Sequence, residues 1–482
     1  MIRVAALGRL LGLFLLALAA TMLLPVLWGL GTGAGGVRPL LLGAAVTGSV
    51  GGALAGLLPR TEGELGQREA LLLVVAAWVA VAAFGSLPFY LSPHFATFTD
   101  ALFEAASGFT TTGATVLGDV EALSEPVQLW RCLSHWLGGM GIVLLGVAVL
   151  PLVGHGGMQL YRAEFSGAKS EKLKPRIAET AIALWKIYVA FTVLQYVVLR
   201  GLGLSVLEAL CHTFSTLGTG GFSTRTASIG AFAEPVLEYV VVAFMLLAGV
   251  SFIQHHRLLV ERQPRRFLAD VEVRAYFALV AAATVVVGGV LLGQGRPPEA
   301  AFRAALFQVS SILTTTGFAS EDFEAWPPLP QVVLLALMFA GGCTGSTAGG
   351  LKTFRLVLLA RVVDREFKRM VERRGVFAVR VGGRVVSEET IQSLLNLVYL
   401  AFVVNFAAVF ALCAVGVDVL TSITAVAASM FNVGPGLGAV GPADHFGHLP
   451  ALAKWVLAGC MIAGRLEFYT VLVILTPAFW RK

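Results

Sequence analysis

The chain has 482 residues, of which 57% are hydrophobic and only 13% are charged. Soluble domains average about 25% charged residues, so this composition excludes a soluble globular protein and predicts one that lies in the lipid bilayer. The net charge of +6 is modest and no stretch resembles a nucleic-acid-binding module, so we expect no nucleic-acid partner.

The first thirty residues carry Arg3 and Arg9 and then a long apolar run. Ala17-Leu18-Ala19 would suit the cleavage site of a signal peptide. The apolar run continues through Trp28, however, which makes it longer than the apolar core of such a peptide. The sequence therefore favours a retained first transmembrane helix.

Ten apolar stretches, including this one, are long enough to cross a bilayer. They are residues 8–30, 37–58, 69–91, 128–153, 180–203, 235–255, 272–294, 329–359, 391–416 and 449–478. Shorter apolar pieces lie between members of the later pairs. Because these pieces are too short to cross, they suit half-helices that enter and leave the membrane on one side.

Each shorter piece ends in a polar phrase that contains glycine. The four phrases are Thr110-Thr111-Thr112-Gly113, Gly218-Thr219-Gly220-Gly221, Thr314-Thr315-Thr316-Gly317 and Phe431-Asn432-Val433-Gly434. A polar backbone inside a membrane is costly unless it lines water or an ion path. One such phrase alone would indicate helix packing or a turn, whereas four in matched context predict a ring of backbone carbonyls, as a cation selectivity filter requires.

The half-helices before these phrases repeat one another. Counted back from the last glycine, the aligned residues are Ala101-Leu102, Ala209-Leu210 and Ala305-Leu306, then Ser107, Ser215 and Ser311, with Ser422-Ile423 and Ala428 in the diverged fourth copy. Such self-similarity indicates a repeated unit, here helix, half-helix, filter strand, helix. We therefore predict an all-α integral membrane protein with four pseudo-symmetric helix–pore-loop–helix repeats around a central pore, plus two N-terminal transmembrane helices.

The predicted boundaries follow from this repeat. They are residues 1–66 for the two N-terminal helices, then 67–154, 155–256, 257–384 and 385–482 for pore repeats one to four. The segments 155–179, 256–274 and 352–384, which link the repeats, are rich in Lys and Arg. The positive-inside rule places these basic loops in the cytoplasm, and ten crossings leave both termini there as well.

The filter loops then face outward, where acidic residues gather. These are Asp119, Glu121, Glu125, Glu321, Asp322 and Glu324. The carboxylates are either solvated loop charges or a device that concentrates cations at the mouth.

A cation that leaves water needs oxygen atoms in place of its hydration shell, and main-chain carbonyls supply them. Glycine lets the backbone turn its carbonyls toward an axis. A neighbouring threonine hydroxyl can coordinate the ion or pin the loop, and each half-helix directs the negative end of its dipole at the central cavity. The residues predicted to form this cation site are Thr111, Thr112, Gly113, Thr219, Gly220, Gly221, Thr315, Thr316, Gly317, Asn432, Val433 and Gly434.

Three further motifs accompany the filters. They are Ser134-His135-Trp136-Leu137-Gly138-Gly139-Met140-Gly141, the glycine-rich run 341–350, and Met461-Ile462-Ala463-Gly464-Arg465-Leu466-Glu467. With these motifs, nearly the whole chain resembles the Trk/Ktr/HKT superfamily of potassium transporters, most closely the TrkH-type membrane subunits of bacteria. The resemblance implies channel-like potassium uptake. Glycine at Gly113, where sodium-preferring plant relatives tend to carry serine, favours potassium, and the second filter is richer in glycine than the others.

The run from Gly341 to Gly350 would weaken any helix. By itself it indicates either a tightly packed kink or a flexible intramembrane loop under the filter, between two half-helices. The resemblance implies that this loop is the gate that obstructs the permeation path. The gate residues are then Gly345, Ser346, Thr347, Ala348, Gly349 and Lys352.

Arg465 falls near the middle of the last apolar stretch, where a charge normally faces a water-filled path or a partner. A structural ion pair is one interpretation, although the nearby Glu467 lies on a different helix face. The resemblance instead implies that Arg465 faces the pore below the filter and tunes the passage of cations.

Other functional classes find little support in the residues. The cysteines lie far apart in or beside apolar segments, so we expect free thiols at Cys132, Cys211, Cys343, Cys413 and Cys460. No zinc spacing among the histidines and no nucleophile–base pair stands out, so we expect no enzyme. A transporter of organic solutes would also use broken helices, but usually in two inverted halves rather than four parallel repeats.

The glycines of Gly154-His155-Gly156-Gly157 lack the strand–turn–helix context of a nucleotide site, so we expect no cofactor on this chain, only potassium as the transported ion. The resemblance implies a cytosolic TrkA-type regulatory subunit that binds a nucleotide (NAD or ATP/ADP). It also implies a homodimer with one pore per protomer, surrounded by lipid in the bacterial cytoplasmic (inner) membrane. The basic loops either dock this subunit or only determine how the chain is oriented in the membrane. Potassium transport is either pure conduction or coupled to protons or sodium.

Overall fold

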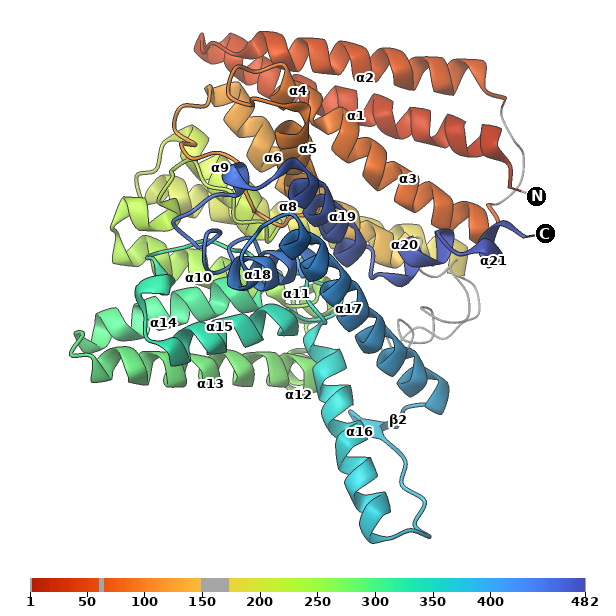
Figure 1. The fold of residues 1–482 in the computed structure, drawn as a ribbon, viewed down its shortest axis with the longest axis vertical. Coiled ribbons are helices and arrows are strands. Elements are labelled where there is room, and N and C mark those ends of the chain that lie inside the picture. Colours follow the sequence, from red (N-terminus) through yellow and green to blue (C-terminus); the bar gives the residue numbers. More distant parts are fainter. Residues whose placement is uncertain (1, 60–64, 149–172, 482) are drawn as a thin grey trace.

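The computed structural model describes residues 2–59, 65–148 and 173–481 (Figure 1). In this part of the chain almost all regular structure is helical. Strands occur there only as a hairpin of β1 (Arg380–Val381) and β2 (Arg384–Val385), in which Arg380 pairs with Val385. The predicted all-α class is confirmed.

The two N-terminal helices, α1 (Val4–Thr32) and α2 (Val37–Leu57), lie side by side along one edge of the molecule (Figure 1). Their contact depends on glycine. A Cβ atom on Gly51 would lie 2.9 Å from the carbonyl oxygen of Gly12, and one on Gly12 would lie 2.7 Å from that of Gly51. Because helices in lipid gain stability by close backbone approach, these small residues fix how the pair packs.

Each pore repeat contains a long first helix, a buried half-helix and a second helix. Repeat one has α3 (Gln67–Gly85), the short α4 (Leu87–Tyr90), α5 (Phe98–Phe109) and α6 (Glu125–Ala148); repeat two has α8 (Leu173–Gly201), α9 (Val206–Leu217) and α10 (Pro235–Gly249); repeat three has α13 (Val271–Gly293), α14 (Pro298–Leu313) and α15 (Pro328–Ala340); repeat four has α17 (Glu388–Ala414), α18 (Val419–Met430) and α19 (Ala451–Arg465). The half-helices α5, α9, α14 and α18 lie at the centre of the core, where most of their side chains are buried.

Six helices of the described residues are long and apolar enough to cross a membrane alone. They are α1, α2, α3 continued by α4, the apolar part of α8, α13 and α17, and they match six of the predicted crossings. The predicted crossing 128–153 corresponds to α6, and its last five residues lie outside the described residues. The chain is thus a multi-pass membrane protein.

Two of the predicted crossings are bent helix pairs, each of which can still form one span. The stretch 235–255 bends by 100° between α10 and α11 (Phe252–Leu259), and the stretch 449–478 bends by 116° between α19 and α20 (Tyr469–Ile474). At the second break, Glu467 and Phe468 have φ angles of 60° and 51°, a left-handed backbone that ends a helix. The break predicted in the stretch 329–359 is present, between α15 and α16 (Thr353–Val371).

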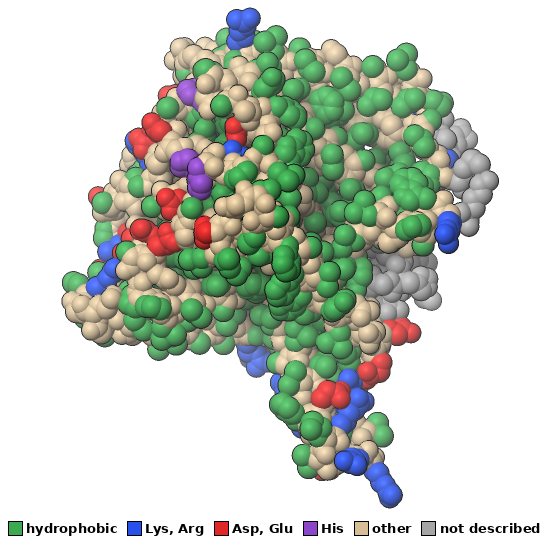
Figure 2. All heavy atoms as spheres, in the orientation of Figure 1, with side chains coloured by type: hydrophobic (Ala, Val, Ile, Leu, Met, Phe, Trp, Pro, Cys, Tyr) green, Lys and Arg blue, Asp and Glu red, His purple; other side chains and the backbone are tan. Residues whose placement is uncertain are grey.

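The cytoplasmic loops predicted from charge are only partly described. The segment 155–179 lies mostly outside the described residues, whereas 256–274 contains α12 (Pro264–Ala269). The segment 352–384 forms α16 and β1, which project from the body of the molecule with basic side chains near the tip (Figures 1 and 2). A short α21 (Pro477–Trp480) ends the chain, and the two termini lie near each other (Figure 1).

We expect Gly51→Leu to lower the thermal midpoint of the purified protein, because overfilling a tight contact costs about 1–3 kcal/mol. The matched control is Gly52→Leu, since a Cβ on Gly52 meets no atom within 4 Å. Thermal unfolding of both variants in detergent measures the effect. Equal midpoints for the two variants would contradict this account of the packing.

Candidate ion-selectivity site

All four filter phrases adopt the same unusual backbone. In each, a residue and the glycine two positions later both have positive φ angles. The angles are 56° and 84° at Thr111 and Gly113, 54° and 79° at Thr219 and Gly221, 54° and 81° at Thr315 and Gly317, and 55° and 109° at Asn432 and Gly434. Non-glycine residues avoid this region of backbone space, so its fourfold recurrence identifies four copies of one structure.

A shared hydrogen bond ties each filter to its half-helix. The amide before the last glycine donates to the carbonyl five residues earlier, at 2.8 Å in every copy. The pairs are Thr112 with Ser107, Gly220 with Ser215, Thr316 with Ser311, and Val433 with Ala428. Because the bond uses the backbone carbonyl, the fourth repeat can carry alanine where the others carry serine.

The last glycines bring the four segments together as a closed ring. A Cβ on Gly113 would collide with the carbonyl oxygen of Gly220, one on Gly221 with that of Thr316, and one on Gly317 with that of Val433. The ring closes at Gly434, whose Cβ would lie 2.8 Å from the carbonyl oxygen of Thr112. A cavity of about 80 Å³ lies beside all four glycines, and residues that follow each filter also line it. The structure therefore brings the predicted filter residues together around one axis.

Each half-helix ends directly at its filter, so its partial negative charge lies next to the ring. Side chains fix three of the opposite ends, since Thr97, Ser205 and Asp418 accept hydrogen bonds from the third helical amide of α5, α9 and α18. The fourth half-helix, α14, starts at Pro298, a residue suited to the first helical position.

Hydroxyl groups brace filters one and three from behind. Thr110 and Thr112 share a hydrogen bond of 2.8 Å between their hydroxyls, and so do Thr314 and Thr316. The Asn432 amide donates to the Thr112 hydroxyl at 2.9 Å, which links filter four to filter one. These hydroxyls therefore pin the loops, one of the two roles predicted for them.

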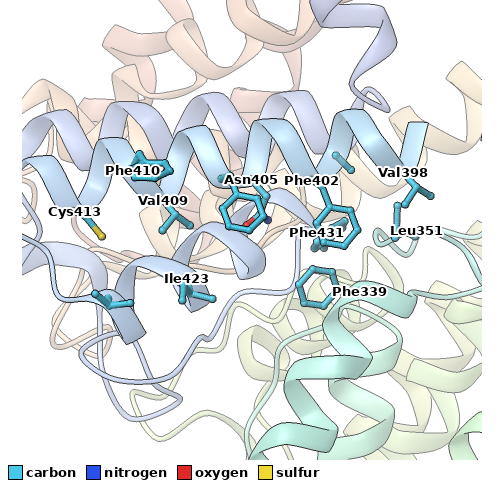
Figure 3. Close-up of a pocket in the computed structure, with 13 residues that line it drawn as sticks. Phe339, Leu351, Val398, Phe402, Asn405, Val409, Phe410, Cys413, Ile423 and Phe431 are labelled. Atoms are coloured by element: carbon cyan, nitrogen blue, oxygen red, sulfur yellow. The ribbon is translucent and has the colours of Figure 1, made fainter. Parts of the chain in front are cut away.

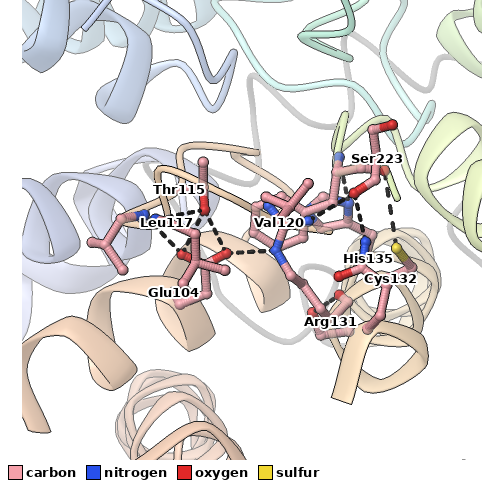
Figure 4. A network of polar contacts seen from close by, with 12 residues as sticks. Glu104, Thr115, Leu117, Val120, Arg131, Cys132, His135 and Ser223 are labelled. Carbon is pink, nitrogen blue, oxygen red and sulfur yellow. Dashed lines mark hydrogen bonds and ion pairs between the residues drawn. The ribbon is translucent and has the colours of Figure 1, made fainter. Parts of the chain in front are cut away.

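A buried ion pair links the loop segments that follow filters one and two (Figure 4). Glu104 on α5 and Arg131 on α6 are 2.6 Å apart and almost fully buried. Glu104 also accepts from the Val116 amide at 3.0 Å, and Arg131 donates to the Ser223 carbonyl at 3.0 Å. Sequence analysis missed this pair, although a carboxylate inside an apolar half-helix is a signal that could have found it.

The loop between α15 and α16 is closed at its base. The amide of Leu351 donates to the Phe339 carbonyl at 3.1 Å, and that of Thr353 to the Gly342 carbonyl at 2.9 Å. Further along the loop, the Gly345 carbonyl accepts a hydrogen bond of 3.0 Å from the Phe252 amide, which lies at the break between α10 and α11. The glycine-rich run is therefore a folded loop rather than a kink.

Residues 347–350 of this loop lie against the end of half-helix α9 and against filters three and four. Thr347 donates to the Leu217 carbonyl at 2.9 Å, Gly349 donates to the Thr315 hydroxyl at 2.6 Å, and Gly350 donates to the Phe431 carbonyl at 3.1 Å. Two other predicted gate residues make contacts inside the loop: Ser346 donates to the Cys343 carbonyl and the Lys352 ammonium donates to the Ala348 carbonyl, both at 2.6 Å.

Arg465 ends α19 at the break in the last helix, directly beside this loop. Its guanidinium is buried and donates to the Thr347 carbonyl at 2.9 Å and to the Gly138 carbonyl at 3.3 Å. No carboxylate of a described residue pairs with it, so the ion-pair interpretation is wrong in this part of the chain. Glu467 instead pairs with Arg355 of α16, at 2.9 Å. Through Arg465 the loop also reaches the first repeat.

A larger cavity of about 470 Å³ lies between α15, α17 and α18 (Figure 3). Its lining is apolar except for Asn405, and it includes Phe339, Phe402 and Phe431. Such a lining offers a cation no oxygen ligands beyond one amide, so we place no cation there.

Several of the acidic residues that were predicted to face outward have structural partners. Glu121 pairs with Arg225, Glu321 pairs with Arg296, and Glu125 accepts from the Trp28 indole at 2.9 Å. Burial raises the pKa of the Glu324 carboxyl, and the nearby carboxylates of Asp322 and Asp444 raise it further. The pairing weakens the view that these residues exist mainly to gather cations.

We expect Glu104→Gln to destabilise the protein by about 3–5 kcal/mol, because it leaves the buried Arg131 guanidinium without its counter-charge. Unfolding of the purified protein by heat or denaturant measures this loss. Glu121→Gln is the control, since its pair with Arg225 is nearly half exposed and contributes little. Similar losses in the two variants would argue against the buried pair as a brace.

Comparison with known proteins agrees with this geometry. The family model for TrkH, a cation transport protein, matches residues 41–482. The chain is 39% identical over 482 residues to the Trk system potassium uptake proteins TrkH of Salmonella typhimurium and of Escherichia coli K12, covering 99% of this chain and of each relative. The crystal structure of the potassium transporter TrkH from Vibrio parahaemolyticus matches it with a TM-score of 0.92 at 37% identity, over 100% of both chains. The chain therefore belongs to the TrkH family of cation transport proteins.

Proposed function

We propose that this chain conducts potassium ions into a bacterial cell across the cytoplasmic membrane. The observation that carries the proposal is the closed ring of four glycines, each against a carbonyl of the next filter. The names of its relatives as potassium uptake proteins support the choice of ion. The chain would hold potassium as cargo and no resident cofactor.

In this mechanism an ion enters from the cavity beside the four glycines and exchanges its hydration shell for backbone carbonyls. The carbonyls next to the glycines belong to Thr112, Gly220, Thr316 and Val433. Four half-helix ends add partial negative charge without a fixed counter-ion, so a cation gains stability but is not trapped. Transport is then conduction down the electrochemical gradient.

Selection of potassium depends on the spacing of these carbonyls. Because each glycine lacks a side chain, the carbonyl of the next filter can approach it closely. These close contacts fix the distances between the carbonyl oxygens of the ring. A side chain at any of the four positions would push that carbonyl away and change the oxygen cage.

The loop between α15 and α16 acts as the gate. Its contacts with the end of half-helix α9 and with filters three and four support a closed state in which Thr347, Gly349 and Gly350 stand under the ring. The Arg465 guanidinium strengthens this state, because it holds the Thr347 carbonyl and places a positive charge on the cation path.

Opening of the gate is proposed to come from the cytoplasm. Helix α16 continues directly from the loop and projects from the body with its basic residues, so a partner bound to α16 can move the loop (Figures 1 and 2). The partner would be a TrkA-type subunit that binds NAD or ATP/ADP, with both termini of this chain on the same cytoplasmic side. The transporter would work as a homodimer with a pore in each protomer.

We expect the chain to restore growth at low potassium, and rubidium uptake, in a bacterium without its own potassium uptake systems. Gly113→Ser should lower the ratio of potassium to sodium uptake by about tenfold, equal to about 1.4 kcal/mol of discrimination. Each form is measured with and without the cognate cytosolic subunit. Failure of the well-expressed chain even with that subunit would favour a transporter of organic solutes.

We expect Arg465→Ala to raise rubidium uptake in the absence of the cytosolic subunit by about fivefold or more. A factor of about five corresponds to the lower end of typical coupling free energies between two sites. The loop loses its charged anchor at the Thr347 carbonyl, and the path loses a positive charge. Arg465→Lys, which keeps the charge, should raise uptake less. Equal, low uptake by the wild type and Arg465→Ala, at equal amounts in the membrane, would refute this role.

A further inference from the structure

The second filter lacks side chains where its counterparts have them. Gly220 stands at the position of Thr112, Thr316 and Val433, one residue before the last glycine. The backbone does not demand glycine there, because the left-handed angles in this filter fall on Thr219 and Gly221 and not on Gly220. Some neighbour must therefore exclude a side chain at this position.

That neighbour is His135 of α6. A Cβ on Gly220 would collide with Nδ1 and Cγ of the His135 ring and lie 2.6 Å from its Cδ2. The ring is fully buried and stacks on Phe222, with centroids 4.1 Å apart and planes 21° apart. The imidazole thus occupies the space behind filter two that threonine side chains fill behind filters one and three.

Hydrogen bonds join the same ring to both ends of the filter. Nδ1 of His135 lies 3.2 Å from the Ser215 hydroxyl, before the filter, and accepts from the Phe222 amide at 3.4 Å, after it. Ser215 also holds the Gly220 amide through its carbonyl, at 2.8 Å. The ring therefore contacts the residues on each side of Gly220 as well as Gly220 itself.

The adjoining turns of α6 are wedged between filters one and two. A Cβ on Gly138 would collide with the Phe109 carbonyl oxygen, and one on Gly139 would lie 2.7 Å from Cα of Gly218. A Cβ on Gly218 would in turn lie 2.5 Å from the carbonyl oxygen of His135. Since α6 is held this tightly, the His135 ring has a fixed position relative to the ring of carbonyls.

We propose that His135 is a positioning residue for ion selectivity, which sets the place of the Gly220 carbonyl from behind the second filter. This carbonyl is the one that borders Gly113, so a shift of the imidazole changes the oxygen cage directly. The inference rests on the proposed function and deepens it, because it assigns to the first repeat a role in the filter of the second.

The proposal is tested by adding a side chain at Gly220, removing the ring of His135, and combining the two changes. Gly220→Thr alone should lower rubidium uptake by about tenfold or more, because the new side chain overlaps the imidazole. His135→Ala alone should leave the carbonyl unsupported and lower the ratio of potassium to sodium uptake by several-fold. The double variant His135→Ala with Gly220→Thr rebuilds the arrangement of filters one and three, and should recover most of both losses.

The control is Gly459→Thr on α19, the same substitution at an exposed position where a Cβ meets no atom within 4 Å. Wild-type uptake in the same cells tests the proposed function separately, since only the variants bear on His135. Normal uptake and selectivity in Gly220→Thr would overturn the inference. So would a double variant that is present in the membrane and as impaired as both singles.

His135→Phe covers the case in which the smaller variants do not fold. It keeps the ring that fills the space and removes the nitrogen that faces Ser215. We expect it to retain uptake, with a loss of selectivity smaller than that of His135→Ala. A loss of selectivity without any change in uptake would not arise from general destabilisation, so this readout separates positioning from folding. Wild-type selectivity in His135→Phe and His135→Ala alike would also overturn the inference.

Discussion

The structure depends on the close approach of a glycine in each filter to a backbone carbonyl of the next filter. Four such contacts close one ring, from Gly113 through Gly221 and Gly317 to Gly434. For the ring to close, four half-helices must end at a common centre, and each filter must adopt the same left-handed backbone. The long helices around them hold this centre in lipid, where polar backbone is stable only if it is enclosed.

Because that contact uses backbone atoms, the four copies have diverged in sequence more than in geometry. Alanine replaces serine at Ala428 while the 2.8 Å hydrogen bond remains. The threonine braces of filters one and three are absent from filter two, where a histidine from the preceding repeat fills the space. The four repeats therefore share the backbone geometry of the ring, whereas the side chains that support each filter differ between them.

Much of this arrangement could be predicted from the sequence, because it rests on patterns that recur. Apolar length predicted the six continuous helices, and the four glycine phrases predicted segments that the structure brings around one axis. The glycine-rich run predicted the loop between α15 and α16, since glycines at this density oppose a helix. Ion binding and gating by these residues stay predictions.

The remaining features depend on contacts between distant residues, which a single sequence does not reveal. The break in the last helix falls on Glu467 and Phe468, residues with no intrinsic preference for a left-handed backbone. Arg465 binds carbonyls of two other repeats, and nothing in its own neighbourhood marks Thr347 and Gly138 as its partners. The pair of Glu104 and Arg131 likewise joins residues 27 positions apart.

The loop closed at its base has a mechanical consequence. Hydrogen bonds from Leu351 to Phe339 and from Thr353 to Gly342 fasten its two ends to each other, so tension applied through α16 cannot stretch it. In the proposed opening of the gate the loop would instead swing as one body and leave the contacts at Leu217, Thr315 and Phe431 together. In the proposed gating mechanism the loop would therefore act as one rigid plug, and the current would switch in single steps rather than rise gradually.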